Sequence, residues 1–346
     1  MKLGIIFGSK STEHEVSVVS GSSVIKNLNK KKYDIYPIYI DKENEWYEVL
    51  DDPKKQDVYK IGELPTNIKA INNVFKYLQN MDCIIPVMHG AYGEDGAIQG
   101  LLKMLDIPYV GCGILSSSVC MDKVITKKIL ERAGILVTPD IYIEYDGIDF
   151  FYVLDDYGTQ KVTVVDIDNL IKKEFGYPVY VKPANSGSSI GISKASNADE
   201  LNVALYEAKK YDKKILIEKA IVAREIECAV LDDLVSAPGE ILSATEFYSF
   251  DAKYKNSKSK TVIPAEISEE ITNDIRSIAK RSFKAIDGKG LARIDFFVEK
   301  DTNKIYLNEI NTMPGFTEIS MYPKMIENMG ISYSELLDKL IEIATK

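Results

Sequence analysis

Residues 290–316, GLARIDFFVEKDTNKIYLNEINTMPGF, contain two apolar segments that are separated by a short polar turn. Each segment predicts a β-strand, and the turn at residues 301–304 makes the two strands neighbours. Side chains two positions apart on a strand point to the same face, so Glu309 and Asn311 lie together. Asp295 on the first strand can converge with them. The sequence therefore predicts three oxygen-bearing side chains at one place on a sheet.

The predicted cluster of Asp295, Glu309 and Asn311 has the chemistry of a metal site. Carboxylate and amide oxygens are hard ligands suited to Mg²⁺, which usually also bridges substrate phosphates. Carboxylates on neighbouring strands repel unless a cation lies between them, which favours a metal site over a solvated strand face. Arg293 points to the same face, where it either stabilises an oxyanion or transferring phosphoryl group or forms a salt bridge with Asp295. The sequence leaves both roles open.

The composition excludes several classes of protein. Hydrophobic residues make up 45% and charged residues 27% of the 346 positions, which is typical of a soluble globular protein of two or three packed units. No apolar run approaches the roughly 18 residues of a membrane helix, and MKLGIIFGSK at the start predicts a strand and not a signal peptide. The net charge of -9 argues against nucleic-acid binding. Four cysteines without CxxC spacing and two histidines suggest neither zinc nor disulfides, so we expect a reducing cytoplasm.

The first part of the chain alternates strand-like and helix-like segments. The predicted strands are KLGIIFG, YDIYPIYI and CIIPVMHG, and the predicted helices cover residues 16–28, 68–79 and the segment GAIQGLLKML. This alternation predicts an α/β domain with a mostly parallel sheet at residues 1–118, and ligands bind at the carboxyl ends of such strands. The loops GSKSTEHEVS and MHGAYGEDG follow predicted strands and are therefore candidate binding loops.

The remainder predicts two α+β units, at residues 119–213 and 214–346. The first has a helix at 122–133, an irregular or hairpin stretch at 142–168, and the strands YPVYVKPA and KILIEKAI on either side of a helix at 199–210. Asn197 and Glu200 are suited to cap that helix. The second has the strands EIECAVL, GLARIDFFVE and KIYLNEI and a helix after Ser268. A final helix begins with a capping box of Ser332 and Glu335.

Several polar loops are candidate ligand sites. KPANSGSSIGISK is rich in Gly and Ser and can approach phosphates, although it lacks the GxxxxGK[ST] pattern and also fits a flexible hairpin. Lys182 at a strand end and Lys123 at a helix start are suited to hold phosphates, although most lysines are merely exposed. Residues 246–260, EFYSFDAKYKNSKSK, predict either a lid with Lys253 near phosphate or an exposed loop.

Acidic and histidine side chains follow the first strands. Glu13 and Glu15 lie between a strand and a helix, where a carboxylate either receives a substrate ammonium or interacts favourably with the helix dipole. His89 is either a polar substrate contact or a structural histidine.

Motifs along nearly the whole chain resemble those of the D-alanine:D-alanine ligases, a family with the ATP-grasp fold. They are, in order, STEHEVS, MHGAYGEDGAIQG, MDK, VKPANSGSSIGISK, IEKAI, EFYSFDAKY, ARIDFF and NEINTMPGFTEISMYPKM. The resemblance implies an ATP-grasp fold with an N-terminal parallel-sheet α/β domain. It also implies a cytoplasmic, ADP-forming ligase that joins two D-alanines through a D-alanyl phosphate for peptidoglycan synthesis.

The resemblance further implies a role for each matching residue. Glu15 would bind the ammonium of the first D-alanine, with Ser188 and Tyr254 hydrogen-bonding nearby as the lid closes, and His89 would contact substrate. Arg293 and the backbone N–H of Gly315 would stabilise the oxyanion, and Ser320 with the backbone of Met321 would bind the second D-alanine. ATP would contact Lys123, Lys182, Glu218, Lys219, Glu225 and Lys253, with Glu218 at the adenine and Glu225 at the ribose. Asp295, Glu309 and Asn311 would bind two Mg²⁺ ions, for which Mn²⁺ is an expected substitute, and the family leads us to expect a homodimer.

Three departures from the family pattern leave alternatives open. Ser9 stands where a second glycine is usual, residues 145–168 form a longer segment than expected, and Glu318 places a charge beside Ser320. FDAKY and SMYPKM resemble the type that selects D-alanine, but a ligase that adds D-serine is a close alternative, because one extra hydroxyl is poorly rejected by size. A non-catalytic nucleotide-binding protein would be expected to lose Arg293 or a metal ligand, and all of them are retained.

Overall fold

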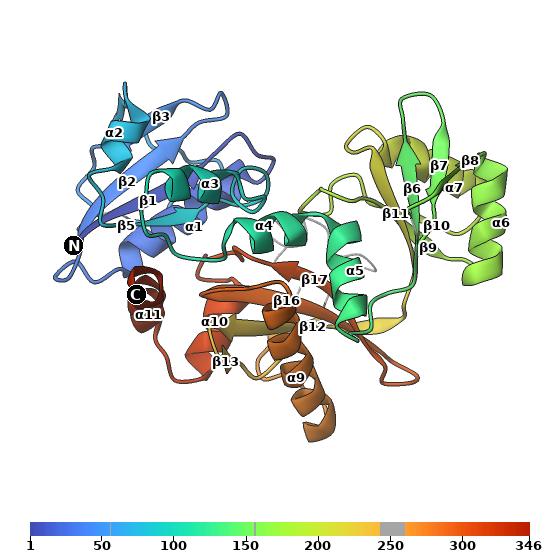
Figure 1. The fold of residues 1–346 in the computed structure, drawn as a ribbon. Helices are drawn as coiled ribbons and strands as arrows, with labels where there is room; N and C mark the ends of the chain where they lie inside the picture. Colours follow the sequence, from blue (N-terminus) through green and yellow to red (C-terminus); the bar gives the residue numbers. More distant parts are fainter. Residues whose placement is uncertain (56, 156, 243–259) are drawn as a thin grey trace.

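Three β-sheets, each formed by a successive part of the chain, organise the protein (Figure 1). The computed structural model describes residues 1–55, 57–155, 157–242 and 260–346. In the N-terminal sheet the strand order is β4-β3-β2-β1-β5. Its strands are β1 (Lys2–Gly8), β2 (Asp34–Ile40), β3 (Trp46–Val49), β4 (Ile68–Ala70) and β5 (Cys83–Val87).

The middle of the N-terminal sheet is parallel, as the sequence predicts. The apolar strand β1 pairs in parallel with β2 and with β5, whereas β3 and β4 extend the sheet in antiparallel fashion. Helices α1 (His14–Asn27) and α3 (Ala97–Met104) follow β1 and β5. Gly8 closes β1 at φ +95°, and a Cβ there would lie 2.1 Å from the carbonyl oxygen of Ile40. Only glycine therefore fits where the chain leaves β1 toward the first candidate loop.

The helix predicted at residues 68–79 is wrong. Ile68–Ala70 is β4, paired with β3, and only Val74–Leu78 forms a short helix, α2. Asn73 is the reason, because its side chain accepts a hydrogen bond from the backbone N–H of Lys76 and starts the helix there. A capping asparagine ends the extended segment before it and competes with a longer helix.

The central sheet is antiparallel, in the order β10-β9-β11-β6-β7-β8. Its strands are β6 (Asp140–Tyr145), β7 (Phe150–Val153), β8 (Thr159–Val162), β9 (Val179–Pro183), β10 (Ser193–Ala195) and β11 (Lys214–Lys219). Helices α6 (Val164–Glu174) and α7 (Ala198–Ala208) bury apolar side chains in the core of this unit. The long segment after residue 145 therefore forms the β6–β7–β8 hairpins, and Asn197 caps α7 as predicted.

The C-terminal sheet has the order β15-β14-β12-β16-β17, with β13 paired to β12. Its strands are β12 (Ala223–Leu231), β13 (Leu234–Val235), β14 (Gly239–Leu242), β15 (Lys260–Val262), β16 (Leu291–Glu299) and β17 (Ile305–Asn311). Helix α9 (Glu269–Ala285), capped by Ser268, packs against this sheet together with α5 (Lys123–Arg132). Helix α4 (Ile114–Met121) leads into α5, which crosses between the sheets (Figure 1). Strand β11 begins at Lys214 and pairs with β6 and β9 of the central sheet. The predicted unit boundary at 213/214 therefore falls just before a strand of that sheet.

The end of the chain returns to its beginning. Helices α10 (Met321–Asn328) and α11 (Tyr333–Thr345) contribute Tyr322, Leu336, Leu337 and Leu340 to the same buried cluster as Leu3, Ile5 and Phe7 of β1. The predicted capping box of Ser332 and Glu335 starts α11. Figure 1 shows α11 beside the N-terminal sheet, although the two are far apart in the sequence. No helix in the described ranges is long and apolar enough to cross a membrane.

Candidate active site

A row of acidic side chains crosses the C-terminal sheet. Asp295 on β16 is directly opposite Glu227 on β12 and Glu309 on β17, and Arg293 is opposite Asn311. Because residues two apart share a face, all five side chains lie on one side of the sheet. The predicted convergence of Asp295, Glu309 and Asn311 is confirmed, and the amide nitrogen of Asn311 donates to Asp295 Oδ2 at 3.0 Å.

Arg293 is held between two carboxylates. Its Nε and Nη2 donate to the two oxygens of Asp295, both at 2.7 Å, and Nε lies 3.2 Å from Glu227 Oε2. The salt bridge that the sequence left open is therefore present, and it fixes the plane of the guanidinium group. Glu227 was not singled out from the sequence. The sequence did hold one indication of it: in the alternating strand EIECAVL, Glu227 follows Glu225 by two residues and so lies on the same face.

A β-bulge sets the direction of the β17 side chains. Asp295 is opposite Glu309 but Phe296 is opposite Leu307, so Asn308 is the extra residue. A regular strand would place Leu307 on the same face as Glu309, whereas the bulge lets Leu307 pack in the core at 1% exposure.

The donor set on this face suits a hard cation. Two carboxylates and one amide offer only oxygen ligands, and Asp295 already binds a cationic group, the guanidinium of Arg293. In the part of the chain that is described, no three His, Cys, Asp or Glu side chains by themselves are arranged to hold a metal ion. A metal at Asp295, Glu309 and Asn311 would therefore need further oxygen ligands, as Mg²⁺ obtains from phosphates and water.

Buried lysines face this sheet from α5 and from the central sheet. The Lys123 amine donates to the carbonyl oxygen of Ser186 in the Gly- and Ser-rich loop at 2.6 Å. Burial lowers the pKa of Lys123, although the nearby carboxylates of Glu309 and Glu218 act in the opposite direction. Lys182 at the end of β9 lies 2.5 Å from Glu218 Oε2. Both predicted phosphate lysines are thus largely enclosed cations near Glu218 and not fully exposed side chains.

Glu218 on β11 is the carboxylate at the centre of this lysine group. Its Oε1 accepts a hydrogen bond from Lys127 at 2.6 Å, and Lys127 also lies 3.0 Å from Asp140. Burial alone would raise the pKa of Glu218, but Lys127 and Lys182 together lower it to about 2. Glu218 is therefore ionised throughout the physiological range, and Lys127 is a second functional candidate that the sequence did not reveal.

The first loop brings Glu13, and not Glu15, to the Gly- and Ser-rich loop. The Ser188 hydroxyl of the Gly- and Ser-rich loop donates to Glu13 Oε1, and Glu13 Oε2 approaches the backbone at Gly90 and Gly187. Glu15 instead lies in the first turn of α1, 3.9 Å from Lys42 and 41% exposed. The structure thus does not bring the predicted Glu15 into the site, because the helix turns it away while Glu13 precedes the helix.

Two side chains of the loop after β5 lie near Glu13 and Arg293. His89 is buried and contacts the carbonyl oxygen of Met313 at 3.0 Å and the Ser20 hydroxyl at 2.9 Å. Burial lowers the pKa of His89. Burial and the neighbouring charge of Glu13 raise the pKa of Glu94 to about 8, although Glu94 accepts the backbone N–H of Gly90 at 2.8 Å. His89 therefore has the structural contacts of a packed histidine at the edge of the site.

The remaining predicted site residues that the structure describes lie on β11, on β12 and from the end of β17 to the start of α10. Ser320 precedes α10, its hydroxyl contacts Thr317 Oγ1 at 2.8 Å, and Met321 is buried beside it. Gly315 lies between the buried residues Pro314 and Phe316 in the segment from β17 to α10. The Glu318 side chain is 64% exposed and lies 3.5 Å from Lys26, pointing away from Ser320 toward α1. Lys219 ends β11 and Glu225 lies on β12, where the chain passes between the sheets, whereas Lys253 and Tyr254 lie outside the described residues.

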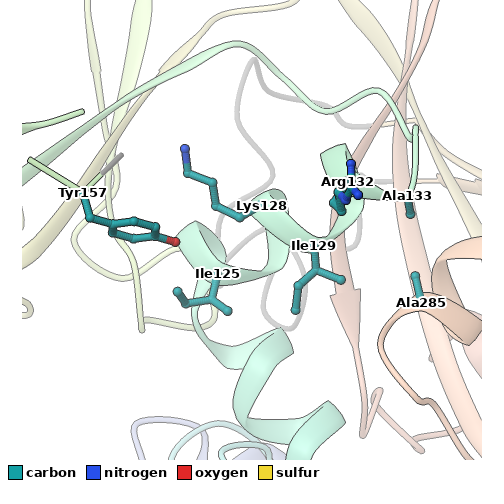
Figure 2. Close-up of a pocket in the computed structure, with 7 residues that line it drawn as sticks. All are labelled: Ile125, Lys128, Ile129, Arg132, Ala133, Tyr157 and Ala285. Carbon is teal, nitrogen blue, oxygen red and sulfur yellow. The ribbon is translucent and has the colours of Figure 1, made fainter. Parts of the chain in front are cut away.

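A cavity of about 490 Å³ lies beside α5 (Figure 2). It is lined by Ile125, Lys128, Ile129, Arg132, Ala133, Tyr157 and Ala285. In a helix of 3.6 residues per turn, Lys123 and Lys127 project to the other face. This open cavity therefore does not belong to the site formed by the acidic and basic groups.

The fold and the site define an ATP-grasp ligase, in which a central and a C-terminal antiparallel sheet carry the cationic and acidic groups of the site. The chain belongs to the D-alanine–D-alanine ligase family. The family model described as D-ala D-ala ligase N-terminus matches residues 2–112, and the model described as D-ala D-ala ligase C-terminus matches residues 149–342.

Known proteins resemble the chain along its whole length. A D-alanine–D-alanine ligase of Clostridium novyi is 47% identical and aligns with 100% of this chain and 98% of its own, and one of Caldicellulosiruptor bescii is 46% identical, with 99% and 95% covered. Among solved structures, the D-alanine-D-alanine ligase of Coxiella burnetii has a TM-score of 0.84 at 33% identity, covering 100% of this chain and 94% of its own. A D-Ala:D-Ser ligase of Enterococcus faecalis has a TM-score of 0.83 at 33% identity, with 99% of each chain covered.

Proposed function

We propose that the protein joins two D-alanine molecules to D-alanyl-D-alanine, with ATP converted to ADP and phosphate, for peptidoglycan synthesis in the cytoplasm. The observation that carries this proposal is the meeting of three parts of a chain of this family around Lys123: Glu13 with Ser188, the Gly- and Ser-rich loop, and Glu309 on the acidic face of β16 and β17. A carboxylate resists attack by an amine because it is already negative and would have to expel oxide. Transfer of the γ-phosphoryl group to a carboxylate oxygen of the first D-alanine supplies a better leaving group, phosphate.

The first D-alanine is oriented by its ammonium. Glu13 is the carboxylate we assign to it, in place of Glu15, because Glu13 lies near Lys123 and is already hydrogen-bonded to Ser188. Lys123 and Lys182 hold the phosphates of ATP. Asp295, Glu309 and Asn311 would hold two Mg²⁺ ions, or Mn²⁺ in their place, which supply positive charge against the phosphate oxygens.

The second step forms the peptide bond. The free amine of the second D-alanine attacks the carbonyl carbon of the acyl phosphate, phosphate leaves, and the amine loses its proton. Arg293, fixed by Asp295 and Glu227, and the backbone N–H of Gly315 stabilise the oxyanion that develops on the carbonyl oxygen. Ser320 and the backbone at Met321 bind the carboxylate of the second D-alanine at the start of α10.

The first experiment measures phosphate release with ATP, Mg²⁺ and D-alanine, and identifies the products by mass when D-serine or D-lactate is added in competition. Dialanine as the main product supports the proposal. A D-alanyl-D-serine product would favour the second candidate, which is motivated by the similarity to the D-Ala:D-Ser ligase of Enterococcus faecalis. No phosphate release in any mixture would refute ligase activity and favour a nucleotide-binding protein without catalysis.

The assignment of the ammonium site is tested with two neighbouring variants. We expect Glu13→Gln to raise the KM for the first D-alanine by about tenfold to a hundredfold, because an ion pair with a charge-assisted hydrogen bond is lost. Glu15→Gln should leave KM within about twofold, since the Glu15 side chain faces Lys42 at the surface. A reversed pattern would return the role to Glu15.

A further inference from the structure

Lys127 shares the carboxylate of Glu218 with Lys182 and has no role in the function proposed above. Its side chain is 6% exposed. The amine donates to Glu218 Oε1 and to the carbonyl oxygen of Thr138, both at 2.6 Å, and lies 3.0 Å from Asp140 Oδ1. An ammonium group has three N–H donors, so these three acceptors satisfy it completely. All three N–H donors of Lys127 on α5 are therefore used within the protein. Their acceptors lie just before β6, at the start of β6 and near the end of β11.

Lys182 binds the same carboxylate in a different way. Among the described residues its amine has one acceptor, Glu218 Oε2, at 2.5 Å. Lys182 lies at the end of β9, immediately before the Gly- and Ser-rich loop, so a phosphate bound at that loop comes within its reach. The two oxygens of Glu218 thus have unlike partners, because Lys127 has no donor left for a ligand and Lys182 has two.

We propose that Lys127 is a positioning residue for recognition of the nucleobase, which holds Glu218 in place while Lys182 exchanges Glu218 for a phosphate oxygen of the nucleotide. The exchange frees Glu218 Oε2 to accept a hydrogen bond from the exocyclic amine of adenine. This inference rests on the ATP-dependent function proposed above. When Lys182 leaves Glu218 for a phosphate oxygen, the same movement therefore binds the phosphate and frees Glu218 to recognise the base.

The charges around Glu218 show what each lysine does. Lys127 and Lys182 contact Glu218, whereas Lys123 lies about one turn earlier on α5 than Lys127. Asp140 faces Glu218 from β6, with the Lys127 amine between the two carboxylates. Burial would raise the pKa of Glu218, and the two contacting lysines overcome that effect and bring it to about 2. Once Lys182 has moved to a phosphate, Lys127 is the contacting cation that keeps Glu218 ionised. Without Lys127, the pKa of Glu218 in the bound state rises.

The test measures binding of ADP and of inosine diphosphate, each with Mg²⁺, by titration calorimetry between pH 5.5 and 8.5. Inosine carries an oxygen where adenine carries the exocyclic amine. The unmodified protein should prefer ADP at every pH. In Lys127→Met, ADP binding should weaken by about tenfold or more at the acid end and recover as the pH rises, because a charge-assisted hydrogen bond is lost when Glu218 is protonated. The affinity of Lys127→Met for inosine diphosphate should not fall at the acid end in the same way.

Matched variants separate this role from a structural one. Lys128→Met, one residue along α5 but on the solvent side, should bind both nucleotides as the unmodified protein does. In a Glu218→Gln background, adding Lys127→Met should change the affinity for ADP by less than about twofold, and the pH dependence should vanish. An equal loss in both backgrounds, or a pH dependence that survives Glu218→Gln and so belongs to Asp140, would overturn the proposal.

Two further results keep the inference separate from other failures. Lys127→Gln retains an N–H donor for Thr138 without the charge, and should show the same pH dependence if Lys127→Met does not fold. If the unmodified protein forms dialanine but Lys127→Met and Lys127→Gln keep the full preference for ADP, this inference alone fails. If the unmodified protein binds no ADP, the proposed function fails as well.

Discussion

Glu94 shows how a single partly buried carboxyl group makes stability depend on pH. Burial, together with the charge of Glu13, raises the pKa of Glu94 from 4.5 to about 8. The folded protein therefore retains a proton between these values that the unfolded chain has lost. We expect the contribution of Glu94 to the free energy of unfolding to fall as the pH rises from 4.5 to about 8, by at most about 1.4 kcal/mol per pH unit.

The measurement is urea unfolding at several pH values in this window, for the unmodified protein and for Glu94→Gln. The difference in free energy of unfolding between the two should decline toward pH 8. Glu13→Gln should make the decline shallower, because it removes the second cause of the raised pKa. A difference that stays constant with pH would contradict the assignment.

Ser9 is a second residue with a measurable local cost. Its φ is +95°, a region that favours glycine, and its buried hydroxyl has no hydrogen-bond partner in the described parts of the chain. Ser9→Gly relieves both effects but loosens the unfolded chain, so we expect a net gain of about 1 kcal/mol in the free energy of unfolding. Ser9→Ala, which removes only the hydroxyl, should gain less. Equilibrium denaturation decides, and a less stable Ser9→Gly would refute the strain at this position.

At the scale of elements, the β16–β17 pair combines a packed core face with a charged site face. Glu309→Gln keeps the shape and the strand pairing but removes one negative charge from the site face. We expect turnover to fall by at least about a hundredfold while the thermal midpoint changes by no more than a few degrees. Asn308→Ala at the adjacent bulge position should retain turnover. Near-normal turnover of Glu309→Gln would exclude a metal ligand at this position.

The same pair of strands shows what the sequence could and could not predict. Alternation placed Arg293, Asp295, Glu309 and Asn311 on one face, because strand periodicity is a local property. The bulge at Asn308 depends on how two strands fit together, and the opposite directions of Glu13 and Glu15 depend on where α1 begins. The alternation in EIECAVL could place Glu227 on a face of β12, but not beside Arg293 of β16. The pairing of β11 with the central sheet and the contact of Lys127 with Glu218 likewise join distant segments, which no local pattern contains.

At the scale of the whole molecule, the core of the N-terminal sheet is closed by the C-terminal helix. Leu336, Leu337, Leu340 and Ile341 of α11 are all at most 2% exposed and pack in that core. Burying four such side chains contributes roughly 6–12 kcal/mol as an upper value, which is comparable to the total stability of a domain. A chain that ends at residue 332 should therefore lose its cooperative thermal transition and bind a hydrophobic dye.

Circular dichroism and dye fluorescence check this expectation. A chain that lacks only Lys346 should melt as the full protein does, because this residue is exposed. Addition of a peptide with residues 333–346 should restore part of the transition. A shortened chain that melts cooperatively near the full-length midpoint would show that the N-terminal unit is stable by itself.

The position of α11 also orders events during synthesis on the ribosome. The strands of the N-terminal sheet are complete at Val87, but the helix that covers their core ends at Thr345. At about 5–20 residues per second, translation of the intervening chain takes on the order of tens of seconds. During that time α1 is already available to pack on the sheet, but the part of the apolar core that α11 closes has no native cover. The protein therefore completes its first domain last, and chaperones that shield apolar surface have a defined interval in which to act.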